Sequence, residues 1–418
     1  MIGTKKLAQV FGRIGLLSFG GPAAQIALMH RELVVERDWL TEAQFLRALS
    51  FCMLLPGPEA MQLATYAGWK QRGIVGGLIG GGLFVIPGAI VIGILALTYG
   101  AYGDLRWMQS LFLGVKAAVV IIVIEALIKV SKRALRRRNH YIIASVSFAA
   151  LFVFAVPFPI VILCTALIGA LQTTVEAPPT LVKLPWAHSA KIIAIGLLVW
   201  AAPIGFAAIF HQALLVEIGL FFSKLAVVTF GGAYAVLAYM TQAVVNTHEW
   251  LTTAQMMDAL GLAETTPGPL ILVTQFVGMM AGYAAGGIWE AIIAGALTLW
   301  VTFVPCFIWI FAGAPLIDWL EGRPKLTGAL SAITAAVVGV IANLTVWFAM
   351  HVFFGEVRPI TVGPIQTILP IWATIEILPI ALGILAGFLL LNRHWGLPWV
   401  LLICAGLSLL TASQMQPL

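Results

Sequence analysis

"SFGGPAAQIALMHRELVVERDWLTEAQFLRALSFCMLLPGP", residues 18–58, begins near a Gly-Gly-Pro, ends on a Pro-Gly-Pro and holds a cluster of charges between them. The pattern returns without a gap 211 residues later as "TFGGAYAVLAYMTQAVVNTHEWLTTAQMMDALGLAETTPGP", residues 229–269. Seventeen of the 41 aligned residues are identical. The chain therefore reads as an internal repeat, with a first copy at 1–174, a linker and connecting helix at 175–210, and a second copy at 211–418.

The composition is that of a membrane protein. Of 418 residues, 61% are hydrophobic and only 10% are charged, whereas soluble domains carry about 25% charged residues. Apolar stretches of about 20 residues recur from end to end, and each is long enough to cross a bilayer as a helix. The alternating pattern of a membrane β-barrel is absent from the sequence. We expect an all-α polytopic membrane protein that has the lipid bilayer as a partner.

Nine apolar segments predict full membrane crossings. The segments around FGGP and PGP in each copy either cross as well or re-enter as hairpins, which gives about 9–13 transmembrane helices. With either count, the second copy enters the membrane from the side opposite to the first. The nine predicted spans are 74–100, 107–130, 140–156, 158–174, 191–211, 284–314, 328–350, 365–391 and 396–413.

Loop charges indicate how the two copies are oriented. Six basic residues of residues 129–138 follow an apolar run, which is typical of a cytoplasmic loop and not of a nucleic-acid site. The basic positions within residues 31–47 have no basic counterparts in residues 242–258. Opposite insertion explains this exchange, so the sequence predicts an inverted-topology repeat with a cytoplasmic N-terminus, as in secondary transporters.

The glycine–proline breaks predict a substrate site. Pro22, Pro58 and Pro269 suit the first turn of a helix, and glycine allows backbone conformations that other residues avoid. A helix N-terminus at membrane depth offers unpaired N–H groups and partial positive charge to an anion. The alternative is that these residues only allow kinks and close packing. The candidate substrate-binding residues here are Ser18, Gly20, Gly21, Gly57, Gln62, Thr229, Gly231, Gly232, Thr265, Thr266, Gly268 and Gln275.

Ionisable residues inside apolar segments are further candidates, because burying each one in a membrane is costly. Lys116, in "FLGVKAAVVII", lies deep in its predicted helix and could either balance the substrate's charge or extend toward an interface. Glu59 and Glu264 flank the two PGP motifs and are candidates for proton coupling, or simply stabilise a helix start. Arg31 and Arg37 are candidates for gating within a solvated loop network.

Enzyme chemistry has little support in the sequence. The four cysteines and seven histidines are scattered without metal-ligand spacing, and no nucleophile–base cluster is evident, so we predict no catalytic residue, no metal site and no cofactor. A phosphate-binding loop of the G-x-x-x-x-G-K-[ST] type does not occur. Gradients of ions or substrate would therefore drive any transport.

The segments "FGRIGLLSFGGPAAQI", "LLPGPEAMQLATYAGW" and "LAETTPGPLILVTQFVG" resemble the paired signatures of the chromate ion transporter (CHR) family in its long, two-domain form. The resemblance covers nearly the whole chain. It implies a bacterial inner-membrane protein that exports chromate and confers chromate resistance, with sulfate as competitor or antiport counter-substrate. The second copy has Ala233 where the first has Pro22, so the two FGG breaks need not bind substrate equally.

Several alternatives stay open at this stage. One is a carrier of sulfate or another oxyanion, working in either direction. Another, from a different class, is a membrane enzyme or scaffold that transports nothing. The coupling ion and the oligomeric state, a homodimer among the options, are not decided by the sequence.

Overall fold

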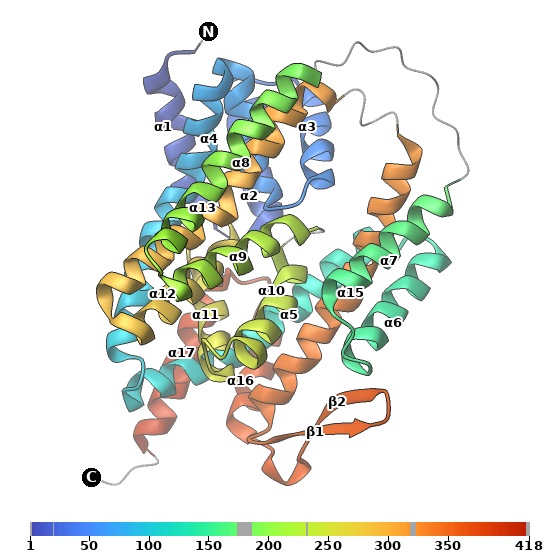
Figure 1. The fold of residues 1–418 in the computed structure, drawn as a ribbon. Helices are drawn as coiled ribbons and strands as arrows, with labels where there is room; N and C mark the ends of the chain where they lie inside the picture. Colours follow the sequence, from blue (N-terminus) through green and yellow to red (C-terminus); the bar gives the residue numbers. More distant parts are fainter. Residues whose placement is uncertain (1, 20, 174–185, 231–232, 318–322, 415–418) are drawn as a thin grey trace. The chain divides into compact units, whose positions relative to one another are not determined.

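A computed structural model describes residues 2–19, 21–173, 186–230, 233–317 and 323–414 (Figure 1). Regular structure in these ranges is almost all helical, and five helices are long and apolar enough to cross a membrane. The all-α polytopic class is thereby confirmed. The predicted residues Gly20, Gly231 and Gly232 and the linker segment 174–185 lie outside the described residues. The five long apolar helices are α4 (Glu59–Tyr102), α5 (Arg106–Ala134), Ser189–Ile209 within α8 (Trp186–Ile209), α13 (Ile288–Gly313) and α15 (Pro324–Phe353).

The chain forms two compact units, and each takes segments from both predicted copies. The first unit combines Met1–Leu97, Thr174–Val236 and Thr266–Thr327, and the second combines Thr98–Thr173, Leu237–Thr265 and Gly328–Leu418. Each compact unit therefore contains residues of both predicted copies.

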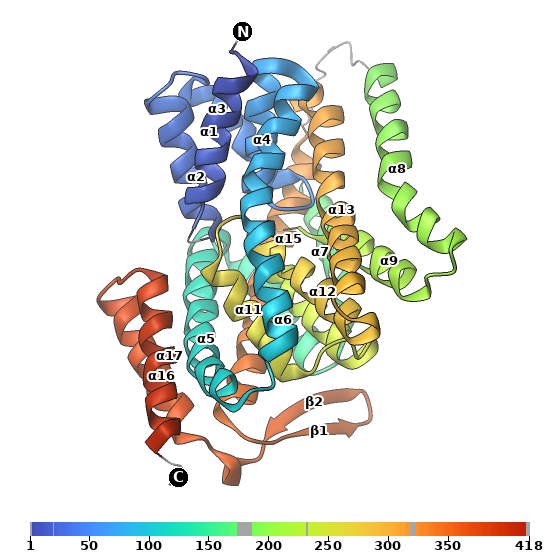
Figure 2. The ribbon, with the colours of Figure 1, turned by 90° about the vertical axis from the view of Figure 1, so that its left-hand side faces the viewer.

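In the first unit, short helices accompany the long ones. Helix α13 packs against α12, α8 and α9, and Figure 2 shows α1, α2 and α3 grouped beside α4. The short elements are α1 (Thr4–Leu17), α2 (Gly21–His30), the π-helix η1 (Arg31–Val35), α3 (Glu42–Leu54), α9 (Ala213–Val228), α10 (Ala233–Gln242, shared with the second unit), η3 (Leu270–Leu272), α12 (Val273–Gly286) and η4 (Ala314–Leu316).

Helix α4 is bent and does not run straight over its 44 residues. Arg72 and Gly73 leave helical geometry, and Gly73 has a positive φ of 56°. The part after the bend matches the predicted span 74–100. The 13-residue part before it, residues 59–71, is about 20 Å long at 1.5 Å per residue, which is less than the roughly 30 Å of a bilayer's hydrocarbon core.

The chain reverses direction between α1 and α2. Arg13 Nε, in α1, lies 3.6 Å from Glu32 Oε1, which follows α2. The rings of Phe11 and Trp39 are 6.2 Å apart between centroids. If α1 and α2 continued in one line, residues 13 and 32 would be more than about 20 Å apart, so these contacts require a hairpin.

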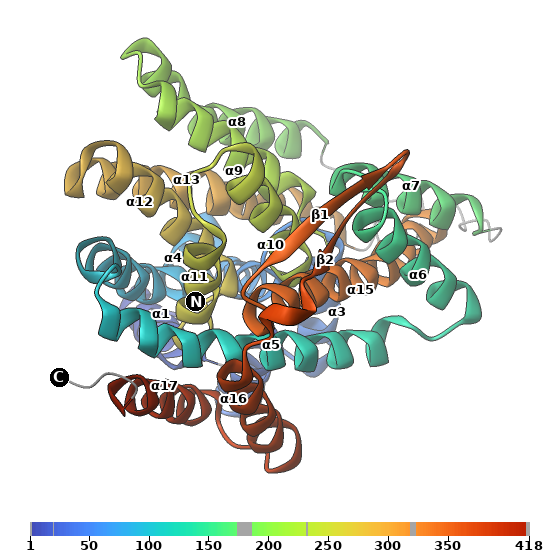
Figure 3. The same ribbon diagram turned by 90° about the horizontal axis from the view of Figure 1, so that it is seen from below.

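In the second unit, α5 is the central helix. Helices α16 (Ile377–Gly387) and α17 (Leu397–Gln414) pack along it (Figure 3). Contact with α17 is close because Gly114 has no side chain: a Cβ there would clash with the Cys404 carbonyl. The remaining elements are α6 (Arg138–Phe152), α7 (Phe158–Leu171), the π-helices η2 (Ala243–Thr247) and η6 (Phe388–Asn392), α11 (Thr253–Thr265), β1 (Val357–Val362), β2 (Ile365–Pro370) and η5 (Trp372–Thr374).

A β-hairpin corrects one predicted span. Strands β1 and β2 pair antiparallel, with Val362 opposite Ile365 and Gly363 at a φ of 59° in the turn. The prediction of a helix over 365–391 is wrong for its first part, because helix begins only at Ile377. Both strands are rich in β-branched residues, which favour strand conformation, and Gly363 and Pro364 form the turn between them. Hydropathy alone did not separate β2 from the helix that follows.

The aligned stretches 18–58 and 229–269 adopt the same local structure. Thr41 and Gln44 form a reciprocal capping box at the start of α3, and Thr252 and Gln255 do the same at the start of α11. Each stretch also contains a five-residue π-helix, followed by an acidic residue with positive φ directly before a tryptophan. These acidic residues are Asp38 (51°) and Glu249 (53°).

Candidate functional site

The broken segments of the two copies meet through a reciprocal pair of backbone hydrogen bonds in the first unit. The Gly57 N–H donates to the Thr229 carbonyl at 2.8 Å, and the Gly268 N–H donates to the Ser18 carbonyl at 2.8 Å. Gly57 and Gly268 are aligned positions, as are Ser18 and Thr229. Each PGP motif therefore holds the FGG break of the other copy.

Glycine is required at these positions for the predicted reason. The φ angles of Gly21, Gly57 and Gly268 are 78°, 117° and 94°, which L side chains rarely adopt. A Cβ on Gly57 would also lie 2.9 Å from both Cys306 Sγ and Gln62 Nε2. The expectation of backbone conformations open only to glycine is confirmed at these three positions.

Gln25, which the sequence analysis missed, stabilises the connection between Ser18 and Gly268. Its Nε2 donates to the Gly268 carbonyl at 2.7 Å and to the Ser18 carbonyl at 3.3 Å. The side chain is 2% exposed. An amide within the apolar run "PAAQIALM" was a signal for this role. The aligned residue in the second copy is Val236, so this brace exists on one side of the repeat only.

The predicted hydroxyl donors make hydrogen bonds within their own helices. Each donates to a carbonyl about one turn earlier, which satisfies the exposed end of the helix at the break. Thr266, the fourth predicted hydroxyl, is buried. The three bonds run from Ser18 to Ile14 (2.6 Å), from Thr229 to Leu225 (2.6 Å) and from Thr265 to Leu262 (2.7 Å).

The two predicted glutamines, Gln62 and Gln275, make the same kind of contact: each side-chain amide donates to a backbone carbonyl. Gln62 Nε2 donates to the Pro56 carbonyl at 2.7 Å, and Gln275 Nε2 donates to the Ala89 carbonyl at 3.0 Å. The Oε1 atom of each is buried and has no hydrogen-bond donor among the described residues. Both glutamines thus brace backbone near a PGP motif and retain an unused acceptor.

A helix begins directly after each PGP motif. Helix α4 starts at Glu59, and η3 starts at Leu270 and leads into α12. The first N–H groups of a helix have no partner within it, and that end carries partial positive charge. Glu59 lies in the first turn of α4. Glu264 does not lie at a helix start: it is in the last turn of α11, the end at which the helix dipole disfavours a carboxylate.

The predicted network of loop charges is present, but it is centred on a buried residue, Glu32, and is not solvated throughout as expected. This carboxylate is fully buried, accepts from Arg37 Nη1 at 2.6 Å and lies 3.6 Å from Arg13 Nε. Arg31 joins through Glu36, at 3.6 Å. Arg31 and Arg37 therefore brace the segment after α2, and Arg13 is a member that the sequence analysis missed.

Lys116 lies in the second unit and is paired with Asp258. Lys116 Nζ is 3.2 Å from Asp258 Oδ1, and the Tyr99 hydroxyl donates to Asp258 Oδ2 at 2.7 Å. Asp258 is 4% exposed. On insertion scales each such charge costs about 2.5–3.5 kcal/mol at the centre of a membrane helix, so ionised residues there usually have a function. Sequence analysis missed Asp258 and Tyr99, although an aspartate within "QMMDALGLA" was a signal.

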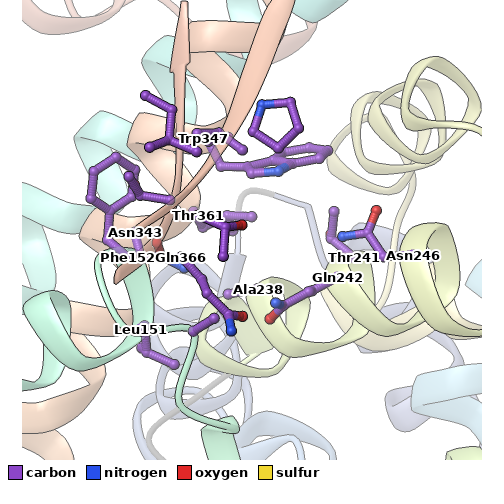
Figure 4. A pocket seen from close by; sticks show the side chains of 16 residues that line it. Leu151, Phe152, Ala238, Thr241, Gln242, Asn246, Asn343, Trp347, Thr361 and Gln366 are labelled. Atoms are coloured by element: carbon purple, nitrogen blue, oxygen red, sulfur yellow. The ribbon is translucent and has the colours of Figure 1, made fainter. Parts of the chain in front are cut away.

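A cavity of about 270 Å³ lies within the second unit, between α10, α15 and the β-hairpin (Figure 4). No lining residue carries a charged side chain. Thr241 is 2% exposed, and its hydroxyl, like that of Thr367, has no hydrogen-bond partner among the described residues. The polar lining residues are Thr241, Gln242, Asn246, Asn343, Trp347, Thr361, Gln366 and Thr367.

A polytopic helical fold with helices broken at buried glycines, and with a charged pair inside its apolar helices, is typical of membrane transport proteins. The chain belongs to the chromate transporter family, whose model matches residues 5–170 and 216–409.

Three curated relatives are each 31% identical to the chain. The chromate transport protein of Cupriavidus metallidurans aligns over 82% of both chains. The probable chromate transport protein of Synechococcus elongatus aligns over 82% of this chain and 84% of its own. The chromate transport protein of Pseudomonas aeruginosa aligns over 84% of this chain and 82% of its own. No solved structure matches the chain significantly.

Proposed function

We propose that this protein is a secondary transporter that exports chromate across a bacterial inner membrane, with sulfate as competitor or counter-substrate. The names of the relatives supply the substrate. The absence of a phosphate-binding loop from the sequence supports a gradient as the energy source. We place the N-terminus in the cytoplasm because the basic run within 129–138 then lies on the cytoplasmic side.

One observation carries the proposed architecture: the reciprocal hydrogen bonds from Gly57 to Thr229 and from Gly268 to Ser18. Two aligned segments that bind each other in the same way are expected where two copies face each other across a pseudo-twofold axis. An axis in the membrane plane would relate copies of opposite insertion. The exchange of basic residues between the loops supports that inverted arrangement.

The dianion, in this proposal, is bound by backbone N–H groups at the paired breaks. The hydroxyls of Ser18, Thr229 and Thr265 and the amides of Gln62 and Gln275 hold the broken backbone in place. The first-turn N–H groups after Gly57 and Gly268 are then the donors that face the anion. A tetrahedral oxyanion, which only accepts hydrogen bonds, suits such a site.

Orientation is tested with two aligned exposed positions, Glu36 and Thr247. Single cysteines are introduced there in a background whose four native cysteines are replaced. A membrane-impermeant maleimide applied to right-side-out and to inside-out vesicles should label the two positions from opposite faces of the membrane. Labelling of both from the same face would overturn the inverted repeat.

Transport is tested by counterflow of labelled chromate in proteoliposomes that contain the purified protein. Internal sulfate or chromate should drive transient accumulation, and internal gluconate should not. Gly268→Ala, which forces a side chain onto a φ of 94°, should abolish counterflow. Gly406→Ala is the matched control, because a Cβ there meets nothing within 4 Å. Absence of counterflow by the wild-type protein would refute the proposed function.

A further inference from the structure

We propose that Tyr99, Lys116 and Asp258 form a buried proton-exchange cluster with two states. In one state Lys116 and Asp258 form an ion pair; in the other the cluster holds a dianion and a proton. This inference rests on the proposed function and names its coupling site. In the state described here, Asp258 neutralises Lys116 at 3.2 Å. A proton taken up by the Asp258 carboxylate would release the Lys116 ammonium to pair with the dianion at a second position on its path, within the second unit.

The geometry favours exchange over a permanent ion pair. Tyr99 already donates to Oδ2 of Asp258 at 2.7 Å, while Oδ1 faces the Lys116 ammonium at 3.2 Å and accepts no hydrogen bond from any other described residue. The pair thus relies on charge attraction at Oδ1, which an incoming dianion can replace once the carboxyl is neutral. Lys116 keeps 17% of its side chain exposed, against 6% for Asp258, so the lysine is the member that a ligand can reach.

Among the described elements that pack around Asp258, Lys116 is the cation that could pair with such a dianion. Lys116 comes from α5, and Tyr99 comes from the end of α4. Helix α17, which also packs on α11, contains no Asp, Glu, Lys, Arg or His. Asp104 follows α4 and is acidic, so it adds no cation. Between Arg106 and Glu125, the described α5 carries only Lys116 as an ionisable charge.

Co-binding has a definite charge balance. The resting pair is neutral, and the loaded site contains a lysine cation, a neutral carboxyl group and a dianion. One proton from the aqueous phase moves with each dianion, so one net negative charge crosses the membrane and not two. Tyr99 is a positioning residue here, since it orients the carboxyl group through Oδ2 and does not meet the anion.

The test measures how dianion affinity depends on pH in proteoliposomes. Chromate is used only on the alkaline side, where it is itself fully a dianion. For one linked proton, the wild-type KM should rise about tenfold per pH unit, and a lumenal pH dye should report proton entry with the anion. Asp258→Asn should keep counterflow, flatten the pH profile and abolish proton entry. Asp258→Glu should restore both, and Tyr99→Phe should shift the profile to more alkaline pH.

The outcomes separate a coupling role from a merely structural one. If Asp258→Asn retains the wild-type pH slope and proton entry, the inference is wrong, whatever its effect on protein yield. If Asp258→Asn fails to fold, Tyr99→Phe still decides, since an unchanged pH profile in that variant would refute the inference. Failure of the proposed function looks different, because no dianion would then cross with the wild-type protein either.

From a different observation we also infer that the 270 Å³ cavity of the second unit is an oxyanion-binding site lined by neutral donors. Figure 4 shows Thr241, Gln242 and Asn246 on one side of the space and Thr361 and Gln366 on the other. The free hydroxyls of Thr241 and Thr367 come from α10 and β2. Two unpaired donors in one uncharged cavity fit a ligand that only accepts hydrogen bonds.

The volume fits a partly hydrated ion. At about 30 Å³ per liquid water molecule, 270 Å³ holds a tetrahedral oxyanion with some of its hydration shell. The cavity lies beside the β-hairpin, in the segment between α15 and α16. By the proposed topology this segment faces the periplasm, so the cavity would receive the ion on the exit side.

Thermal unfolding of the purified full-length protein tests this site, with sodium sulfate as probe and sodium gluconate at equal ionic strength as reference. Thr241→Val removes an unpaired buried hydroxyl, so it should raise the midpoint without sulfate by about 2 °C or more and reduce the shift that sulfate produces. Thr345→Val is the matched control: its buried hydroxyl donates to Ile341, so it should lower the midpoint and leave the sulfate shift unchanged. An unchanged sulfate shift in Thr241→Val would overturn the site.

Discussion

Gly57→Ala is expected to disrupt the connection between the two copies. Gly57 has a φ of 117°, and placing an L side chain in such a sparsely populated backbone region costs on the order of 1–3 kcal/mol. The new Cβ would also lie 2.9 Å from Cys306 Sγ and from Gln62 Nε2, and overpacking of that kind costs about 1–3 kcal/mol. The sum, about 2–6 kcal/mol, is enough to break the bond from Gly57 to Thr229.

The assay combines thermal unfolding in detergent with chromate counterflow in proteoliposomes. Gly57→Ala should lower the unfolding midpoint by several degrees and reduce counterflow at least tenfold. The double variant Gly57→Ala/Cys306→Ala removes the sulfur contact and should recover part of the stability, because only the backbone strain and the Gln62 contact remain.

Gly12→Ala provides the control within the same unit. A Cβ on Gly12 meets nothing within 4 Å, and its helical backbone accepts alanine, so this change should stabilise the protein by about 0.5–1 kcal/mol. If Gly57→Ala proves as stable and as active as Gly12→Ala, the reasoning about the paired breaks is refuted.

Three further substitutions test other contacts. Gln25→Leu removes the donor to the Gly268 and Ser18 carbonyls and should lower the free energy of unfolding by about 1–3 kcal/mol, measured by denaturant titration in detergent; no loss would exclude Gln25 as a brace. Glu32→Gln should weaken the contact with Arg37 and cost about 1–2 kcal/mol, measured by denaturant titration in detergent; unchanged stability would contradict the charge network. Gly114→Ala should separate α5 from α17 near Cys404 and cost at least about 1–3 kcal/mol, measured as a lower unfolding midpoint; an unchanged midpoint would contradict the close helix contact.

The sequence was sufficient for features that depend on local chemistry. The bend at Arg72–Gly73 marks the start of the predicted span at 74, and the positive φ angles of Gly57 and Gly268 follow from the PGP motif itself. The aligned capping boxes at Thr41 and Thr252 follow from sequence identity between the copies. In each of these cases neighbouring residues alone determine the backbone.

Contacts between segments far apart in the sequence could not be predicted from the sequence. Lys116 was singled out, but its partner Asp258 is 142 positions away, and no local pattern pairs them. Gln25 reaches Gly268 across 243 positions for the same reason. The β-hairpin was missed because β2 (Ile365–Pro370) is followed closely by the apolar helix α16, and pairing between β1 and β2, not hydropathy, sets the conformation of the strands.

The central claim is that a dianion binds at the paired glycine–proline breaks, and anomalous X-ray diffraction at the chromium absorption edge tests it most directly. In crystals grown with chromate, we expect an anomalous peak within hydrogen-bonding distance of the backbone amides that follow Gly57 or Gly268. An ordered chromium peak elsewhere, with none beside either break, would contradict the claim.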